Sequence, residues 1–271
     1  MSEEFLIQWI NDNFDGINGE LSSIVDLLTL SPKDFNSTIW NTMINIFNAI
    51  LPVALTILSI LFAITLIEKM MRVDMNVDFD TIFKIILYFV IAKVVMSNCF
   101  NILEIILSTN KVLLDKVNLS VTVSQNNTLS EQLIEYVKND ISGSINRLGF
   151  YMQYMVPALL LKILSLIVSV IVYGRFIQLF TLTALAPLPI ACIGNEKTRH
   201  ITLRFVQEYI AVCLQGLVIL IAVYIYMSML SSFDMQGGLS EVVWGTIKIS
   251  IIIVMALFSS GGVARKIVGA G

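Results

Sequence analysis

Three cations stand inside long apolar stretches, where a charge has few favourable environments. Lys93 lies near the middle of residues 85–103, and Lys162 and Arg175 are the only charged residues between 148 and 195. A charge in apolar surroundings is costly, so such a side chain pairs, faces water, or extends its charged end to a polar boundary. Two roles stay open for Lys93: a polar contact in an interior or interface, and a lysine that extends to the boundary.

The residue types that build catalytic and cofactor sites are scattered. The only histidine is His200, and Cys99, Cys192 and Cys213 lie far apart in apolar surroundings. The sequence has no phosphate-binding GxxxxGK[ST] loop, no GxSxG elbow, no HExxH motif and no cysteine pair at metal-ligand spacing. We therefore expect no catalytic residue, no metal, no cofactor and no ATP hydrolysis by this chain.

The composition points to a membrane. Of the 271 residues 56 % are apolar and 14 % are charged, whereas soluble domains are roughly 45–50 % apolar with glycine included and about 25 % charged. One soluble domain of this size cannot bury so much apolar surface. The net charge of −3 creates no basic field for nucleic acid. These numbers exclude a soluble enzyme and predict an all-α integral membrane protein.

Five stretches are long and apolar enough to cross a membrane, which takes about 20 residues. They lie near 44–67, 82–106, 154–175, 209–230 and 247–264. Arg175 ends the third stretch, where we expect its side chain to extend to the membrane boundary. Lys162 begins a polar face with Ser165, Ser169 and Tyr173, which suits contact between helices.

Lys and Arg are unevenly distributed between these stretches. Eight fall in the 39 residues of 68–84, 194–208 and 265–271, and six fall in the 99 residues of 1–38, 108–150 and 231–248. Segments rich in Lys and Arg stay in the cytoplasm. We expect a plasma-membrane protein with its N-terminus outside, an outer loop at 108–150, an inner basic turn at 194–208 and its C-terminus inside. A six-span arrangement, in which 148–195 crosses twice, stays open but would put the basic turn outside.

The N-terminal segment, residues 1–38, precedes a predicted transmembrane domain of residues 39–271. It carries one apolar stripe at helical spacing: Leu6, Ile10, Phe14, Ile17, Leu21, Ile24 and Leu28. This period predicts an amphipathic helix. Helices that lie on membranes usually carry Lys and Arg, but this segment has seven acidic residues and one lysine. It either rests on the outer membrane surface or packs against partner helices.

Residues 172–195, VYGRFIQLFTLTALAPLPIACIGN, stay apolar beyond the length of one crossing. Pro187 and Pro189 break the helical pattern because proline lacks the N–H that continues a helix, and Gly194 lies near the end of the stretch. Irregular backbone is not tolerated in contact with lipid. The stretch is either one long kinked helix or a segment covered by protein or re-entering the membrane. If it is covered, we expect it to be a cytoplasm-side contact surface of an oligomer.

A family resemblance rests on this same stretch. The run VYGR…LTALAP-P…GN, the basic turn after it, Gln215 with Gly216, and the Gly-rich basic end resemble the TrbL-like conjugal transfer proteins. These VirB/Trb-type proteins are polytopic inner-membrane subunits of conjugative type IV secretion systems, and the variety of Gram-positive mobile elements is the most similar. The resemblance extends over most of the chain, including the N-terminal helix and the outer loop.

The resemblance implies a non-enzymatic channel or scaffold subunit that supports transfer of DNA and protein between cells. It also implies a homo-oligomer in membrane lipid, beside secretion ATPases and a coupling protein, and leaves direct contact with nucleic acid open. The alternative is a small-solute permease or a pore-forming protein. A coupled transporter more often shows acidic residues in its spans or inverted repeats around broken helices, and neither is evident in this sequence.

Overall fold

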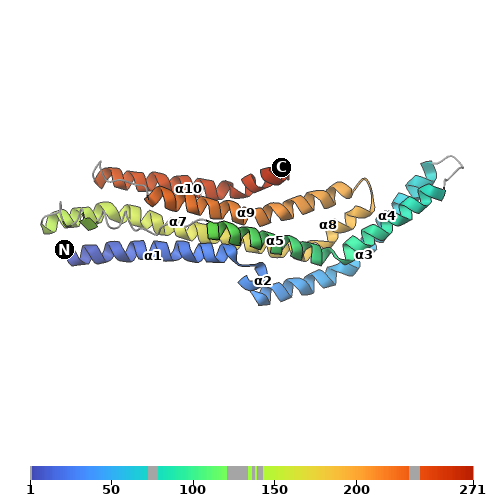
Figure 1. The fold of residues 1–271 in the computed structure, drawn as a ribbon, viewed down its shortest axis with the longest axis horizontal. Helices are drawn as coiled ribbons and strands as arrows, with labels where there is room; N and C mark the ends of the chain where they lie inside the picture. The colour runs from blue at the N-terminus through green and yellow to red at the C-terminus, as the bar shows by residue number, and fades with distance from the viewer. Residues whose placement is uncertain are drawn as a thin grey trace. The chain divides into compact units, whose positions relative to one another are not determined.

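The computed structural model describes residues 2–72, 79–120, 143–231 and 239–270, with positions 134, 135 and 138. In this part of the chain every regular element is a helix. The helices, shown in Figure 1, are α1 (Glu3–Thr29), α2 (Pro32–Phe35), α3 (Ser37–Arg72), α4 (Phe79–Ser97), α5 (Cys99–Ser120), α7 (Ser144–Leu185), α8 (Pro187–Ala191), the 3₁₀-helix η1 (Cys192–Gly194), α9 (Arg199–Ser231) and α10 (Leu239–Val268).

Four helical stretches are long and apolar enough to cross a membrane: Ser37–Met71, Ile145–Leu185, Arg199–Met229 and Ile247–Val268. The pair α4 and α5 meets the same criteria together, which gives up to five spans. The predicted fold class, an all-α membrane protein with about five spans and an N-terminal helix, is therefore confirmed. The helix α7 has 42 residues, which at ~1.5 Å per residue is about 63 Å. It is longer than a hydrocarbon layer of ~30 Å.

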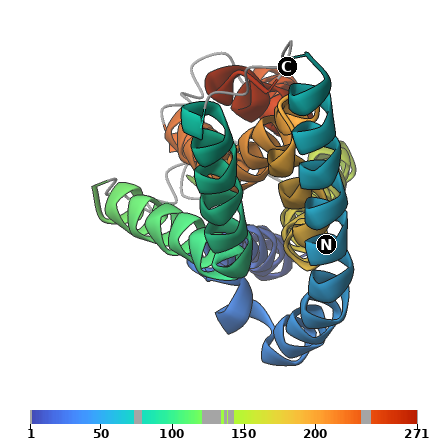
Figure 2. The ribbon, with the colours of Figure 1, turned by 90° about the vertical axis from the view of Figure 1, so that its right-hand side faces the viewer.

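The second predicted span, 82–106, is wrong as one continuous helix. The chain bends by 58° between Ile82–Ser97 and Cys99–Ser120, and Figure 2 shows the change of direction between α4 and α5. Asn98 sits at the break, where its side-chain Nδ2 donates to the carbonyl of Val94 at 2.9 Å. An Asn side chain that bonds to nearby backbone competes with regular helix, and this favours a turn.

Two predicted connections are shorter than the sequence suggested. The segment expected as an outer loop, 108–150, is helical at both ends, since α5 continues to Ser120 and α7 begins at Ser144. The basic turn expected at 194–208 is mostly helix, because α9 begins at Arg199. On α5 the buried side chains Leu103, Leu107 and Leu114 keep the helical period beyond residue 106, the end of the predicted span, and this period sustains the helix.

The third predicted span is also longer than expected. A helix from Tyr154 to Arg175 was predicted, whereas α7 continues without interruption from Ser144 through Gly174 and Arg175 to Leu185. For residues 172–195 the structure combines the two predicted arrangements. Residues 172–185 belong to the long helix α7, and the residues from Pro187 onward form separate short elements. The short elements α8 and η1 follow a turn at Ala186.

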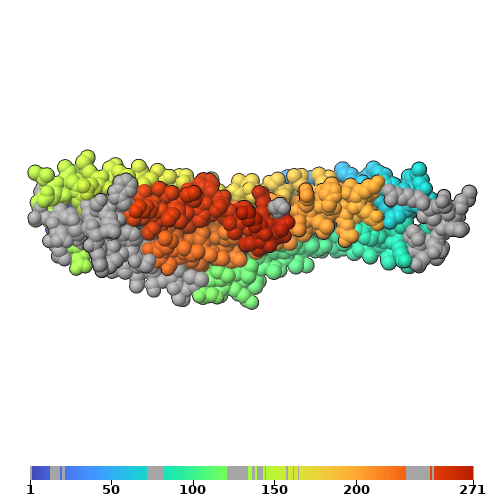
Figure 3. Space-filling model, turned by 90° about the horizontal axis from the view of Figure 1, so that it is seen from above, coloured from blue at the N-terminus to red at the C-terminus, as the bar shows by residue number. Residues whose placement is uncertain are grey.

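The chain divides into two compact units, and α7, α9 and α10 each contribute to both. The first unit comprises residues 1–29, 113–174 and 216–260, and the second comprises 30–112, 175–215 and 261–271. In the first unit α1 packs on the beginning of α7. Trp9 lies 4.7 Å from Tyr151 between ring centroids, and Arg147 pairs with Glu3 at 2.6 Å. In the same unit α9 and α10 lie side by side (Figure 3).

In the second unit α2 is fixed to its neighbours by charge and by stacking. Asp34 in α2 accepts from Lys111 Nζ at 2.8 Å and from the Ser31 hydroxyl at 2.7 Å. These hydrogen bonds, that from Lys111 first, hold the pKa of Asp34 below its ordinary value because they stabilise the charged carboxylate. Phe35 stacks on Phe176 with 4.1 Å between ring centroids.

Helix α3 is much less covered by the rest of the chain than α9. Only 11 % of the most apolar stretch of α3 is buried, against 44 % for α9. Val53, Ile60 and Ile67 on α3 are among its exposed apolar side chains. A surface of this kind is stable only against lipid or against another protein.

Candidate functional site

In the second unit, hydrogen bonds, ion pairs and a cavity surround η1, and we call this region the η1 site. α8 and η1 pack on α3 and α4. The closest approach is at Gly194, where an added Cβ would lie 2.7 Å from Leu58 Cδ1 and 3.2 Å from the Leu58 carbonyl oxygen. Only glycine lets the η1 backbone lie this close to α3, so Gly194 fixes the position of the turn that follows it.

Hydrogen bonds link the same two segments. The Thr65 hydroxyl on α3 donates to its own helix at Leu61 O, 2.9 Å away, and lies 3.3 Å from the Gly194 carbonyl oxygen. After η1, the Thr198 hydroxyl donates to the Cys192 carbonyl at 2.7 Å, which closes the turn. The Thr65 hydroxyl is therefore occupied by the protein itself.

Charged side chains join α3 to the turn after η1. Lys69 Nζ lies 3.1 Å from Glu196 Oε1, and Lys197 Nζ lies 2.7 Å from Glu68 Oε1. All four side chains are at least one-third exposed, so each pair contributes about 1 kcal/mol or less. Each segment carries a glutamate followed directly by a lysine, and the glutamate of one segment pairs with the lysine of the other.

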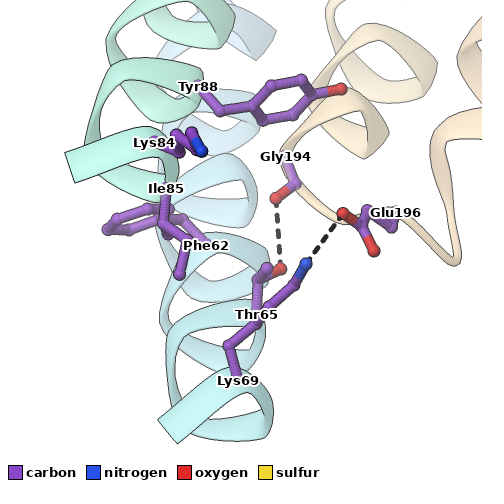
Figure 4. Close-up of a pocket in the computed structure, with 8 residues that line it drawn as sticks. All are labelled: Phe62, Thr65, Lys69, Lys84, Ile85, Tyr88, Gly194 and Glu196. Carbon is purple, nitrogen blue, oxygen red and sulfur yellow. Dashed lines mark hydrogen bonds and ion pairs between the residues drawn. The ribbon is translucent and has the colours of Figure 1, made fainter. Parts of the chain in front are cut away.

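A cavity of about 240 Å³ lies beside the Lys69–Glu196 ion pair. Figure 4 shows its lining, with Phe62, Thr65 and Lys69 from α3, Lys84, Ile85 and Tyr88 from α4, and Gly194 and Glu196 from η1 and the following turn. The guanidinium of Arg199 lies 6.0 Å from the ring centroid of Tyr88, a favourable cation–π distance. The cavity thus combines an apolar wall with several charged groups.

The two prolines predicted to break the helix do so by removing a hydrogen bond. The N–H of Ala186 still reaches Thr183 O at 3.4 Å, but Pro187 has no N–H to extend the series. Pro187 starts α8, as expected for proline at a first helical position. Pro187 is buried, and the Pro189 carbonyl accepts from the Thr202 hydroxyl on α9 at 2.8 Å.

The prediction that Arg175 extends to the membrane boundary is wrong. Arg175 lies within α7 rather than at its end, and its side chain is only 2 % exposed. Its Nε and Nη1 have no hydrogen-bond acceptor among the described residues. The guanidinium carbon lies 5.5 Å from the ring centroid of Phe176, a cation–π distance, but buried N–H groups without acceptors are still destabilising.

Lys93 is exposed on α4 and lines a hollow of about 340 Å³ that has both polar and apolar walls. Thr56 and Ser59 of α3 line the same hollow, although their hydroxyls donate to carbonyls of their own helix. In the part of the chain that the structure describes, no carboxylate lies within ion-pair distance of Lys93. Both roles considered for Lys93 therefore stay open.

Lys162 lies on α7, outside the η1 site. It is exposed, as is Tyr173, whereas Ser165 of the same predicted face is buried. The predicted polar face of α7 is therefore partly covered by the rest of the chain, at Ser165, and partly exposed, at Lys162 and Tyr173.

The N-terminal stripe is covered by the chain itself where its side chains are described. Leu6, Ile10, Ile24 and Leu28 are all 1 % exposed or less. The side chains of the three central members, Phe14, Ile17 and Leu21, lie outside the described part. The stripe therefore packs at least in part on α1's own neighbours within the first unit.

Among the described residues no group of three or more His, Cys, Asp or Glu side chains is placed to hold a metal ion. The three cysteines are free thiols, and Cys99 and Cys213 are buried. The η1 site itself combines ammonium groups, one guanidinium, two carboxylates and an apolar wall.

Sequence reasoning identified Gly194, Pro187 and Pro189 but missed the α3 and α4 members of the η1 site. The signal was partly present, because Lys69, Lys84 and Lys197 all fall in the segments rich in Lys and Arg. What the sequence lacked was any indication that η1 lies against the end of α3, since Thr65 and Gly194 are 129 residues apart.

The fold and this site define a multi-pass helical membrane protein. Residues 17–187 match the family described as TrbL/VirB6 plasmid conjugal transfer like protein. The match spans well over half of the chain, and the protein therefore belongs to this family of conjugal-transfer membrane subunits. Comparisons with curated proteins and with solved structures find no match. The matched region includes α3 and α4 of the η1 site and ends at Pro187, before η1.

Proposed function

We propose that the protein is a non-enzymatic channel or scaffold subunit of the inner-membrane complex of a conjugative type IV secretion system, of the variety found in Gram-positive mobile elements. The observation that carries the proposal is the family match over residues 17–187. The uncovered apolar surface of α3 supports it, because a subunit of a larger assembly needs surface for neighbours. Its partners are further copies of itself, secretion ATPases and a coupling protein.

The contact between copies is proposed to lie on the outward face of residues 176–193. Ile177, Thr181, Leu185 and Leu188 are exposed and follow one another at helical spacing. Phe176, Phe180 and Ala184, each one position before a member of this set and on the adjoining face of α7, are buried within the chain. Only the first set is free to meet a neighbour, so it defines the part of this stretch that an oligomer can use.

Cysteine crosslinking tests this contact. Single cysteines at 177, 181 and 185, in a background without the native cysteines, should form covalent dimers in native membranes. The matched controls are cysteines at 176, 180 and 184, which should remain monomeric. Free labelling of the first set by aqueous reagents in the assembled complex, without dimers, would reject this surface as an interface.

The domain division and orientation belong to the same proposal. The segment 1–38 lies outside the cell, the domain 39–271 spans the membrane, and the C-terminus lies in the cytoplasm. Reporter fusions after residues 130 and 195 should read outside and inside respectively. A fusion after residue 195 that reads outside would support six spans instead.

Co-purification separates an assembly subunit from a small-solute permease. The full chain, tagged and extracted from native membranes with a mild detergent, should retain secretion ATPases and the coupling protein. Deletion of its gene should abolish DNA transfer in a mating assay, and the intact gene supplied in trans should restore it. A chain that purifies alone and whose loss leaves transfer intact would favour the permease.

A further inference from the structure

Two opposite charges in the bent helix pair α4 and α5 have no partner within the described part of the chain. Lys93 on α4 and Glu104 on α5 are both exposed, and no described residue forms an ion pair or a hydrogen bond with either side chain. The pair Ile82–Ser97 and Cys99–Ser120 is apolar enough to cross a membrane. Charged residues in such helices are rare, and they pair with one another or face water.

Glu104 differs from the other acidic residues of the candidate spans, which are Glu68, Asp115 and Glu208. Glu68 is held by Lys197 at 2.7 Å, and Glu208 is held by Arg265 at 2.6 Å. Asp115 lies five residues before the end of α5, next to Lys116. Glu104 is therefore the carboxylate of the apolar part of these helices that still needs a cation.

Acidic residues before α4 and at its start are too far from Lys93 to pair with it. The nearest one in the sequence is Asp80, 13 positions before Lys93, which is about 20 Å along the helix. After Lys93 the next acidic residue is Glu104 itself. The need of Lys93 for a partner therefore does not depend on the residues outside the described part that precede α4.

The hollow beside Lys93 has room for a side chain from another molecule. Its volume is about 340 Å³, and Thr56 and Ser59 of α3 and Phe89 of α4 line it together with Lys93. The two hydroxyls donate to carbonyls of their own helix, but their oxygens can still accept from the ammonium, which has three N–H donors. What the hollow lacks is a negative charge.

The bend between α4 and α5 (Figure 2) reduces the difference in depth between the two charges. On one straight helix, 11 residues would separate Lys93 and Glu104 by about 16 Å. With the bend of 58°, the six residues from Asn98 to Glu104 advance only about 5 Å along the direction of α4, so the offset falls to about 12 Å. A lysine and a glutamate side chain that extend toward each other from neighbouring molecules cover most of this offset.

The surface around both charges favours a second copy of the chain as the partner. Val90 and Val94 near Lys93, and Ile102 and Ile105 near Glu104, are exposed. Lipid would cover these apolar side chains but would leave both charges without a partner. A second copy covers them and also supplies a carboxylate for Lys93 and an ammonium for Glu104.

We propose that Lys93 of one copy pairs with Glu104 of the neighbouring copy, whose carboxylate enters the hollow between α3 and α4. The contact is head-to-tail, so each copy in a closed ring uses its Lys93 on one side and its Glu104 on the other. This inference rests on the proposed function, which includes a homo-oligomer, and it adds a contact within the membrane to the one on residues 176–193.

Charge reversal in differently tagged full-length chains tests the pairing. Two copies that both carry Lys93→Glu present only carboxylates at this contact, and two copies that both carry Glu104→Lys present only ammonium groups. In either case co-purification of one tag with the other from native membranes should fall about tenfold relative to wild type, because like charges then meet. A Lys93→Glu chain expressed with a Glu104→Lys chain should co-purify to within about twofold of wild type. A pair within one chain would not be restored in this mixture, so its recovery identifies a contact between copies.

Neutral variants and a second lysine provide the controls. Lys93→Met or Glu104→Gln alone leaves one charge of the pair without a partner and should weaken co-purification, whereas the two changes together should restore it, because replacing both charges is often neutral or stabilising. Lys162 is also exposed within a candidate span, so a Lys162→Glu chain is expressed with a Glu104→Lys chain. This mixture should not co-purify. The amount of each chain in washed membranes is measured to show that it has inserted.

Three results would overturn the pairing while wild-type copies still associate, and these leave the proposed function standing. The first is normal self-association of the charge-reversed chains, and the second is a mixture of inserted chains that does not recover. The third is recovery with Lys162→Glu, which would make Lys162 the partner of Glu104. If the reversed chains do not insert, the neutral variants decide, and unchanged co-purification of Lys93→Met and Glu104→Gln rejects the pair. Wild-type copies that do not associate would reject the homo-oligomer of the proposed function as well.

Discussion

The substitution Gly194→Ala tests the packing of η1 on α3, because the structure gives the new methyl group no room. Its Cβ would lie 2.7 Å from Leu58 Cδ1 and 3.2 Å from the Leu58 carbonyl oxygen. Leu58 is only 1 % exposed, so its side chain cannot simply swing away, and the carbonyl belongs to the α3 backbone. The turn must therefore move away from α3.

The size of the effect follows from two contributions. Inserting a methyl group into a well-packed site costs about 1–3 kcal/mol. Moving the turn also weakens the Thr65 contact with Gly194 O, where a hydrogen bond contributes about 0.5–1.5 kcal/mol. A small gain from replacing glycine in a helical turn opposes these costs. We expect local destabilisation of about 2 kcal/mol, which increases the open population roughly 30-fold.

A buried thiol in α8 reports this opening. Ala191 is fully buried, so Ala191→Cys in a Cys192→Ser background should react with a maleimide only when α8 and η1 separate from α3. Gly194→Ala should raise the labelling rate roughly 30-fold by the same free energy. The control is Gly262→Ala in α10, where no heavy atom lies within 4 Å of the new Cβ and the rate should not change.

A double-mutant cycle identifies the clash as the cause. Leu58→Ala removes the atom at 2.7 Å but leaves the carbonyl at 3.2 Å. The double variant should therefore be less destabilised than the sum of the two single variants. Labelling that is unchanged by Gly194→Ala, or effects that simply add, would refute the close packing of η1 on α3.

Four further predictions address other parts of the chain. Ile10→Asp should release α1 and speed its proteolysis, because a carboxylate in a fully buried position costs several kcal/mol; unchanged digestion would place Ile10 at a surface. Arg175→Met should leave the thermal midpoint in detergent unchanged or higher, since Nε and Nη1 have no acceptor among the described residues; a drop of several degrees would mean that the guanidinium is paired. Lys93→Leu should insert into the membrane more efficiently, since a lysine near the bilayer middle costs about 2.5–3.5 kcal/mol. It should also lower DNA transfer, because it removes a polar contact. Normal transfer would mean that the Lys93 side chain only extends to the membrane boundary. Asp34→Asn should lower the thermal midpoint slightly at pH 7, and the difference should shrink as the pH is lowered below 3.8. The lowered pKa of Asp34 gives stability that is present above its ordinary value of 3.8 and lost as the pH falls through the folded value. A difference that does not change with pH would show that the Lys111 contact is not electrostatic.

The sequence by itself determined the fold class and most helix positions. These depend on local patterns, such as the charge-free run before Glu68 and the apolar stripe that includes Leu6, Ile10, Ile24 and Leu28. A helix satisfies its own backbone hydrogen bonds, so its existence follows from residues a few positions apart. The prolines at 187 and 189 likewise act locally, through the N–H groups they lack.

Helix ends were less predictable, since the charge-free stretches define where lipid can be rather than where the helix stops. α5 and α7 both extend past charged residues because their buried faces continue, as Leu114 on α5 illustrates. The break at Asn98 depends on one side-chain hydrogen bond to Val94 O, which composition does not reveal. A hydropathy pattern averages over such single contacts.

Only the tertiary structure decided which cations share a site. By sequence Arg175 was a boundary residue, yet the packing around α7 buries it. Lys69 and Lys84 were counted only as charges between spans, yet both line one cavity with Gly194, which contacts Thr65, 129 residues away in the sequence. Local periodicity fixes which face of each helix is apolar, but the choice of neighbouring helix depends on how side chains such as Leu58 fit the backbone at Gly194, and this fit is a property of two distant segments together.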